Sequence, residues 1–202
     1  MKPLRALLLN CTLKPSPARS STDVLLGELA EHLDGHGVTC DTVRVVDHQV
    51  RFGVEVDEGD GDAWPEIRQR MLASDILVLG TPIWLGQPSS VAKLVLERLD
   101  AELGESDDDG RFLTMDKVAG VAVVGNEDGA HHTSAEIYQG LSDVGFTIPP
   151  NAVTYWVGEA MGGTDYADLD ERPDKTAETT KTLASYLAHL ARVLIDHPYP
   201  AS

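Results

Sequence analysis

Apolar residues gather in five short runs that have the length and composition of β-strands. They lie at residues 4–9, 38–46, 76–79, 118–124 and 153–157. Most of these runs are largely apolar, which is typical of strands covered on both faces. The run at 38–46 alternates weakly between apolar and polar residues, so we expect it to lie nearer an edge of the sheet.

Helices are predicted between these runs, because apolar residues recur there at spacings of three and four. The first helix follows the capping residues Ser20–Asp23 and ends before Gly35. Inward-facing apolar residues of the later helices lie within 67–72, 91–99, 137–144 and 183–194. Strand and helix thus alternate five times, which predicts a mostly parallel sheet with helices on both faces. The chain is too short for an eight-stranded barrel, so we expect a doubly wound α/β fold, in one domain over residues 1–202.

The charge of the chain excludes some partners. Acidic residues outnumber basic residues by 33 to 16, which gives a formal net charge of −17. Nucleic-acid binding needs a basic stripe, and none is present, so we expect no nucleic-acid partner. The charge also disfavours an anionic membrane, and no run approaches the roughly 18 apolar residues of a membrane-spanning helix. Such acidity fits a high-salt habitat or basic protein partners, and the sequence does not choose between them.

Cysteine content and the first residues bear on the cellular compartment. Two cysteines are too few for a disulfide scaffold, a cysteine-ligated zinc site or an iron–sulfur cluster. The apolar run at residues 6–9 is shorter than the roughly 7–15 residues of a signal-peptide core. We therefore expect a cytoplasmic protein with no membrane association.

In a doubly wound sheet the ligand lies beyond the carboxyl ends of the strands, so the loops after the first, third and fourth strands are the candidate site. The first loop has neither a G-x-G-x-x-G nor a Walker A pattern. It gathers hydroxyl groups and two cations before a helix, namely Thr12, Lys14, Ser16, Arg19, Ser20, Ser21 and Thr22. A helix N-terminus with such side chains suits a phosphate, although the last three hydroxyls could merely cap the helix.

The second loop, residues 80–90, places Trp84 and Leu85 where the topology points them out of the sheet. A proline-framed loop that displays an aromatic ring suits a flat heteroaromatic ligand. The alternative is that Trp84 packs on a neighbouring loop or subunit.

The third loop combines flexible glycines with polar groups over residues 125–132. Its acidic residues and two histidines raise the possibility of a metal site. However, the adjacent His131 and His132 would point about 100° apart on a helix, so we expect no metal.

These loops resemble those of the flavodoxin-like flavoproteins, in particular the NAD(P)H-dependent FMN reductase and multimeric-flavodoxin quinone reductase group. Thr81-Pro82-Ile83-Trp84 matches that family's T-P-[IV]-[YW] flavin loop. Residues 10–22 resemble its serine-rich phosphate loop, and residues 125–129 resemble its third flavin loop. The resemblance covers essentially the whole chain. It implies a five-stranded parallel sheet in the order 2-1-3-4-5 and FMN as the cofactor.

Carried over by position, the resemblance assigns three groups of contacts. The phosphate would be held by Thr12, Ser20, Ser21 and Thr22, with Lys14 beside them. The flavin ring would be bordered by Pro82, Ile83, Trp84, Leu85 and Gly86, and on its other edge by Gly125, Asn126, Glu127, Asp128 and Gly129. The family's G-S-P-R opening is here Cys11-Thr12-Leu13-Lys14, which leaves the contacts of Cys11 and Lys14 open.

The resemblance implies an oxidoreductase that passes electrons from NAD(P)H through the flavin to a quinone, another flavin or a different small acceptor. His131 is a candidate for protonating or positioning the acceptor, although packing of its helix is an alternative role. The family implies a homodimer or homotetramer. A flavodoxin-type electron carrier that docks basic redox partners, without NAD(P)H activity of its own, is the alternative function.

Overall fold

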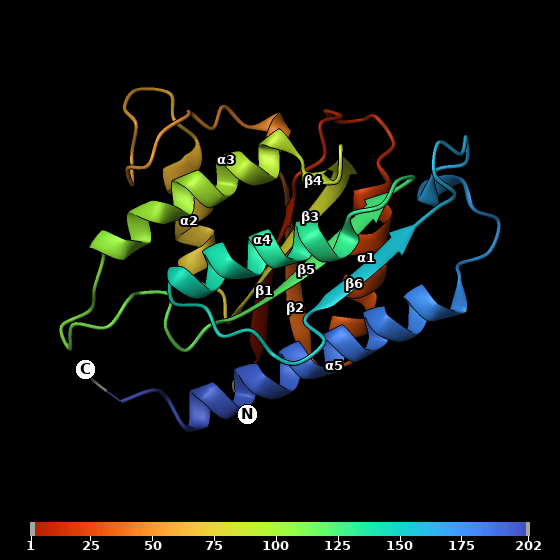
Figure 1. Ribbon diagram of the computed structural model, residues 1–202. Coiled ribbons are helices and arrows are strands. Elements are labelled where there is room, and N and C mark those ends of the chain that lie inside the picture. Colours follow the sequence, from red (N-terminus) through yellow and green to blue (C-terminus); the bar gives the residue numbers. More distant parts are fainter. Residues whose placement is uncertain (1–2, 201–202) are drawn as a thin grey trace.

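Five parallel strands form the centre of the molecule, in the order β2-β1-β3-β5-β6 (Figure 1). The computed structural model describes residues 3–200. The strands are β1 (Leu4–Asn10), β2 (Val38–Arg44), β3 (Ile76–Trp84), β4 (Gln87–Pro88), β5 (Val118–Gly125) and β6 (Val153–Val157). The helices are α1 (Ser21–Asp34), α2 (Trp64–Leu72), α3 (Ser90–Leu99), α4 (Ala130–Asp143) and α5 (Asp174–Asp196). Because β4 is a short addition to β3, this order is the predicted flavodoxin-like 2-1-3-4-5 arrangement.

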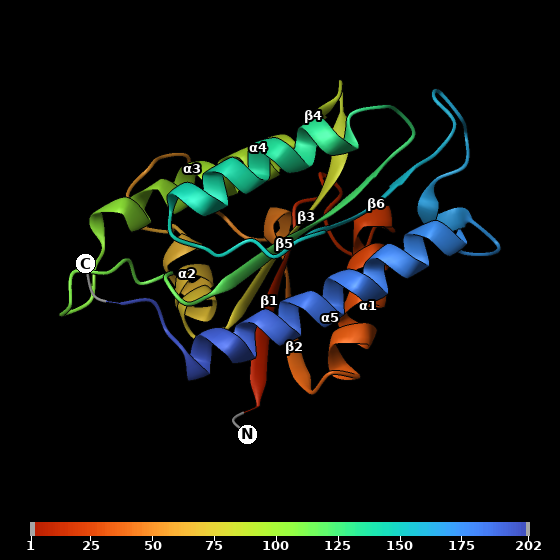
Figure 2. The same cartoon turned by 60° about the horizontal axis from the view of Figure 1, so that its bottom comes forward.

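Helices cover both faces of the sheet. Leu8, Val78 and Ala122 pack with α1 and α5 on one face, whereas Leu9 and Val121 pack with α2, α3 and α4 on the other. Figure 2 shows α1 and α5 side by side on one face, and α3 and α4 side by side on the other. The apolar runs that predicted buried strands are therefore apolar because both of their faces are covered. Within the described part of the chain, every helix is too short or too polar to cross a membrane.

The third strand is longer than predicted. The apolar run ends at Leu79, but β3 continues to Trp84 and turns back through Leu85 and Gly86 into β4. Gly80-Thr81-Pro82 has the composition of a turn, yet it pairs in register with β5 and is largely buried. Leu85 and Gly86, which form the turn between β3 and β4, have positive φ values of 53° and 73°, as a two-residue hairpin requires. The second loop is thus a rigid hairpin. Similarly, β2 ends two residues earlier than predicted, because residues 45–47 form a 3₁₀ turn.

The acidic segment between β2 and α2 is more firmly held than its composition predicts. The sequence suggests a solvated loop at residues 47–62, but the side chains of Asp62 and Arg98 are completely buried and form an ion pair of 2.8 Å. Arg98 also donates hydrogen bonds to the carbonyl groups of Arg51 and Glu55. Isolated buried charges are costly, so this pairing fixes the loop against α3.

Candidate functional site

A cavity of about 450 Å³ opens at the carboxyl ends of β1, β3 and β5, where the topology predicted a ligand site. It brings together twelve of the residues that the sequence assigned to a cofactor. These are Thr12, Lys14, Ser20, Ser21, Thr22, Pro82, Ile83, Trp84, Leu85, Gly125, Asn126 and Glu127. Gly86, Asp128 and Gly129, which were assigned with them, are not among the residues that line the cavity. The three loops thus converge on one cavity.

One end of the cavity is built from the loop before α1 and from the first turn of that helix. Ser20 caps the helix, and its hydroxyl accepts a hydrogen bond from the Asp23 amide at 3.3 Å. The Asn10 side chain accepts from the Thr12 amide and donates to the Asp23 carboxylate, which fixes the loop. The first amide groups of a helix have no intrahelical acceptor and carry partial positive charge. This end can therefore bind an anion without relying on a cation.

The other two loops are locked together by a carboxylate. Glu127, from the loop after β5, accepts hydrogen bonds from the amide groups of Leu85 at 3.2 Å and Gly86 at 3.1 Å. These are the two residues of the hairpin turn. The bonds hold the tip of the hairpin against the loop, so both walls of the cavity keep a fixed spacing.

Removing the Glu127 carboxylate should loosen the hairpin. In Glu127→Ala we expect the amide hydrogens of Leu85 and Gly86 to exchange about tenfold faster, because hydrogen bonds to a charged group are lost. Hydrogen exchange read at these two amides tests this. In Asp128→Ala, a control at the neighbouring exposed carboxylate, the rates should stay as in the unchanged protein. If the two amide hydrogens exchanged as slowly in Glu127→Ala as in the unchanged protein, Glu127 would not hold the hairpin.

Two glycines are needed because the walls approach each other closely. A Cβ on Gly129 would lie 2.7 Å from the Gly86 Cα, and one on Gly125 would lie 2.9 Å from the Ile83 Cβ. Gly129 also has φ near +123°, which other residues rarely adopt. The glycines of the third loop thus allow contact between loops, rather than direct approach to a ligand.

Gly129→Ala should separate the two walls, because its Cβ meets the backbone of Gly86 and no side-chain movement can relieve the contact. We expect a loss of about 1–3 kcal/mol of stability and at least a tenfold weaker affinity for a ligand of this cavity. Chemical denaturation and ligand titration measure the two effects. Gly104→Ala is the control, since its Cβ would meet nothing within 4 Å. An unchanged affinity in Gly129→Ala would show that the spacing of the walls does not matter.

A fourth wall was not assigned from the sequence. The segment after β6 contributes Met161, Asp165 and Tyr166 to the cavity, and β6 itself contributes Trp156. Tyr166 is fully buried, and burial together with the hydrogen bond to Glu28 raises the pKa of its phenol. A signal in the sequence was the position of this segment, since it follows a strand that ends at the same edge of the sheet.

His131 does not line the cavity. Its Nε2 lies 3.3 Å from the Tyr155 hydroxyl, and the two rings meet edge to face with centroids 5.3 Å apart. His132 instead pairs with Glu136 at 2.9 Å and contacts Gln87 at 2.8 Å. No cluster of metal-ligating side chains occurs among residues 3–200. The contacts of His131 are those of the packing alternative, and its role in protonation stays a prediction.

Cys11, in the loop between β1 and α1, is completely buried, and burial raises the pKa of its thiol. A protonated, inaccessible thiol packs as a small apolar residue. Ser89 Oγ donates a hydrogen bond of 2.6 Å to the carbonyl group of Cys11, which ties the first loop to the start of α3.

The residues of the cavity suit the three parts of FMN. Asn126 Oδ1 is buried without a hydrogen-bond partner, while Nδ2 of the same side chain donates to Gly162 and Asp165, both at 3.2 Å. An acceptor held in this way needs a donor, and the flavin ring and ribityl chain carry N–H and O–H groups. Trp84 and Ile83 offer apolar surface for a ring, and the start of α1 offers donors for a phosphate.

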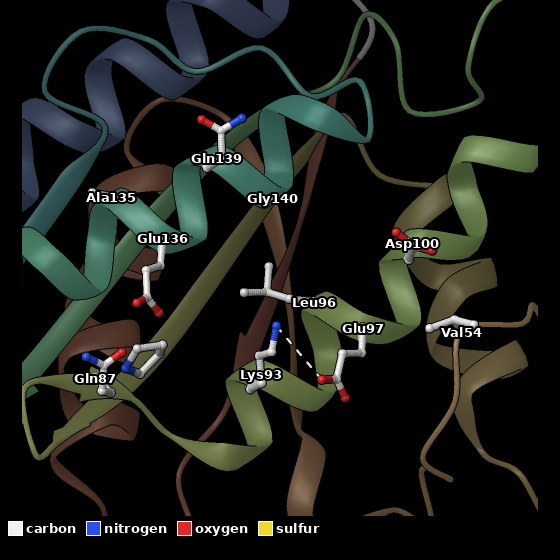
Figure 3. A pocket seen from close by; sticks show the side chains of 11 residues that line it. Val54, Gln87, Lys93, Leu96, Glu97, Asp100, Ala135, Glu136, Gln139 and Gly140 are labelled. Atoms are coloured by element: carbon white, nitrogen blue, oxygen red, sulfur yellow. Dashed lines mark ion pairs between the residues drawn. The ribbon is translucent and has the colours of Figure 1, made fainter.

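A second, larger cavity of about 980 Å³ lies between α3 and α4 (Figure 3). Lys93 and Glu97 line it from α3, Asp100 from the 3₁₀ turn that follows α3, and Glu136 and Gln139 from α4. Figure 3 shows Lys93 directed toward Glu97, with which it forms an ion pair of 3.8 Å. This open, charged groove contains none of the residues that the sequence assigned to the site.

Comparison with known proteins agrees with this geometry. Residues 4–161 match the family described as NADPH-dependent FMN reductase. A 208-residue alignment shows 36% identity to the 8-demethyl-8-aminoriboflavin-5'-phosphate synthase of Streptomyces davaonensis and covers 97% of this chain and 80% of that protein. A Mycobacterium bovis protein named divalent metal cation transporter MntH is 40% identical over 198 residues, which cover 95% of this chain but only 29% of that protein.

Solved structures show the same similarity. RosB with a bound intermediate, 8-demethyl-8-formylriboflavin-5'-phosphate, superposes with a TM-score of 0.88 at 35% identity, covering 97% of this chain and 82% of RosB. The NAD(P)H:acceptor oxidoreductase FerB of Paracoccus denitrificans has a TM-score of 0.65 at 14% identity, over 97% of this chain and all of FerB. At that identity the second match supports the fold alone.

Proposed function

Because the chain belongs to the NADPH-dependent FMN reductase family, an FMN-binding group of oxidoreductases that uses NAD(P)H, we propose that it passes electrons from NAD(P)H through FMN to a quinone, a second flavin or another small acceptor. The observation that carries this proposal is the single cavity formed by the hydroxyl-rich start of α1, the rigid hairpin and Asn126. When bound, FMN supplies the chemistry, which is reversible uptake of a hydride. The protein supplies binding and orientation.

In this proposal the chain's own residues hold the flavin at three places. Thr12, Ser20, Ser21 and Thr22 bind the phosphate together with the amide groups at the start of α1. Pro82, Ile83, Trp84 and Leu85 border the ring, and Asn126 Oδ1 accepts a hydrogen bond from the flavin. Gly86 and Gly129 support these walls by their close approach, and Asp128 is given no contact with the flavin. No step is assigned to His131.

The exposed hairpin leaves room for the other reactants. Trp84 is 53% exposed and Leu85 is 92% exposed at the mouth of the cavity. NAD(P)H and then the acceptor would approach there in turn, which predicts a two-step exchange at one place rather than simultaneous binding.

Oxidation of NAD(P)H by the purified protein tests this function. With FMN and a quinone such as menadione present, we expect steady loss of NAD(P)H absorbance that depends on the protein and on FMN. Glu127→Ala and Gly129→Ala should lower the rate at limiting FMN. Binding of FMN without NAD(P)H oxidation would contradict this function and would fit an electron carrier instead.

A second candidate function is modification of FMN itself. It is favoured by the 36% identity, over nearly the whole chain, to a synthase whose name describes a flavin altered at position 8. In that case FMN recovered after incubation would differ in mass from the FMN supplied. An unchanged mass, together with NAD(P)H oxidation, would exclude this candidate under the conditions tested.

We also propose that the protein forms a homodimer or a homotetramer. The exposed apolar side chains of Phe52, Leu85 and Met161, which are 83%, 92% and 95% exposed, are surfaces that association could cover. Light scattering on the eluting protein would give one, two or four chain masses. A single chain mass at micromolar concentration would exclude a stable oligomer.

A further inference from the structure

The segment after β6 is fastened across the phosphate end of the cavity. We call residues 158–172 the strap. Arg19, in the loop before α1, forms an ion pair of 2.6 Å with Asp168 of the strap and also donates to the Ala167 carbonyl group. The Ala167 amide in turn donates to Ser21 Oγ at 3.2 Å. The strap therefore contacts a cation and a hydroxyl that the sequence placed in the phosphate loop.

Asp165 of the strap reaches to both sides of the cavity. One carboxylate oxygen lies 3.8 Å from Lys14 Nζ in the first loop, and the other accepts from Asn126 Nδ2 in the third loop at 3.2 Å. Asp165 lines the cavity, and its side chain is 49% exposed. A single carboxylate thus joins the phosphate loop to the ring loop.

The cations at this end are already neutralised. Lys14 is paired with Asp165, Arg19 with Asp168, and Arg44 with Asp23 at 3.0 Å. A flavin phosphate carries close to two negative charges at neutral pH. At this end of the cavity it would lie beside Asp165, which lines the cavity, and near the loop whose Arg19 is paired with Asp168. It would attract Lys14 and Arg19 only in competition with the strap, on a chain whose net charge is −17.

We propose that Asp165 and Asp168 compete with the ligand's phosphate for Lys14 and Arg19, and that they thereby keep FMN exchangeable with FMN in solution. This inference rests on the proposed function, because it requires that FMN binds in this cavity. The two residues determine how strongly the phosphate is held, so the flavin can leave the site rather than remain as a permanently bound group.

The strap has a separate anchor, so the effect of charge can be tested without releasing it. Tyr166 donates a hydrogen bond of 2.5 Å to Glu28 on α1, and Arg172 donates to the same carboxylate at 2.5 Å. The Arg172 guanidinium also lies 4.8 Å from the centre of the Tyr166 ring. Substitution of Asp165 or Asp168 by Asn keeps these contacts and the size of the side chain.

The experiment is a titration of the purified, flavin-free protein with FMN and, separately, with riboflavin, followed by flavin fluorescence. Asp165→Asn and Asp168→Asn should each bind FMN about three- to tenfold more tightly, since each removes one partly exposed, partly screened negative charge near the phosphate. Riboflavin, which has no phosphate, should bind within about twofold of its original affinity. Asp108→Asn, an exposed acid of another loop, is the charge-matched control and should change neither affinity.

Two further measurements separate competition from other causes. In the background of Lys14→Met, the gain in FMN affinity from Asp165→Asn should be smaller than in the original protein, because the contested cation is gone and only the direct repulsion between Asp165 and the phosphate is relieved. The gain in FMN affinity of the two single variants, Asp165→Asn and Asp168→Asn, should also be smaller at high salt. Unchanged or weaker FMN binding in both variants, or equal tightening of riboflavin, would overturn the proposal. Absence of FMN binding in the original protein and in all variants would instead overturn the proposed function, and this inference with it.

Discussion

Replacement of Ser21 by Asp should weaken FMN binding by about a hundredfold or more. Ser21 is the first residue of α1 and lines the phosphate end of the cavity. A carboxylate there would lie next to the phosphate, and two like charges about 4 Å apart at an effective dielectric constant near 20 repel by about 4 kcal/mol. The fold should persist, because acidic residues are favourable in the first turn of a helix. Titration with FMN measures the loss.

Two comparisons show whether the Ser21 effect comes from charge. Ser21→Asn has a side chain of the same size without the charge, and it should bind FMN within about tenfold of the original protein. Riboflavin binding should be affected far less than FMN binding in Ser21→Asp, since the repelled group is missing. If Ser21→Asp bound FMN as well as the original protein, the phosphate would have to lie elsewhere.

Arg98→Met should lower the free energy of unfolding by about 3–5 kcal/mol, the cost of leaving one charge of a buried pair without its partner. The side chains of Arg98 and Asp62 are both completely buried. Denaturation in urea measures the loss. Arg192→Met, on α5, removes another partly buried arginine that makes no ion pair with a carboxylate among the described residues, and should cost much less. A loss below about 1 kcal/mol in Arg98→Met would show that the buried pair contributes little.

The same ion pair predicts how stability changes in acid. Burial alone would raise the pKa of Asp62, but amide donors from Glu58, Arg51 and Trp64, together with the Arg98 guanidinium, outweigh it and lower the pKa. The ionised form is therefore favoured by folding, so its contribution is complete above the unfolded pKa of about 3.9. This stabilising contribution is lost as the pH falls through the lower pKa that Asp62 has in the folded protein. In Asp62→Asn that part of the acid dependence should be missing.

The sequence predicts the sheet well because its central strands are covered on both faces. Runs such as residues 118–124 are apolar for that reason, and their order with the helices restricts the topology to a doubly wound sheet. The place of the start of α1 at one end of the cavity was also predictable, because Ser20 is a capping residue and marks a helix N-terminus after a buried strand.

Other features depend on contacts between distant segments, and local patterns do not encode these. Gly80-Thr81-Pro82 has turn composition, and only pairing with β5 makes it part of a strand. Glu127 looked like a ligand contact, whereas in the fold it also holds the hairpin amides of Leu85 and Gly86. The strap was not assigned to the cofactor cavity from the sequence, because Asp165 contacts residues as far away along the chain as Lys14.

Whether the protein binds FMN and reduces it with NAD(P)H is read from one absorbance spectrum, recorded on the purified protein with one equivalent of FMN before and after NAD(P)H is added without oxygen. We predict flavin bands that differ from those of free FMN, that stay with the protein on rapid gel filtration, and that bleach when NADH or NADPH is added. Ser21→Asp should show only the spectrum of free FMN. A spectrum of free FMN from the original protein, with none retained and no bleaching, would contradict the account.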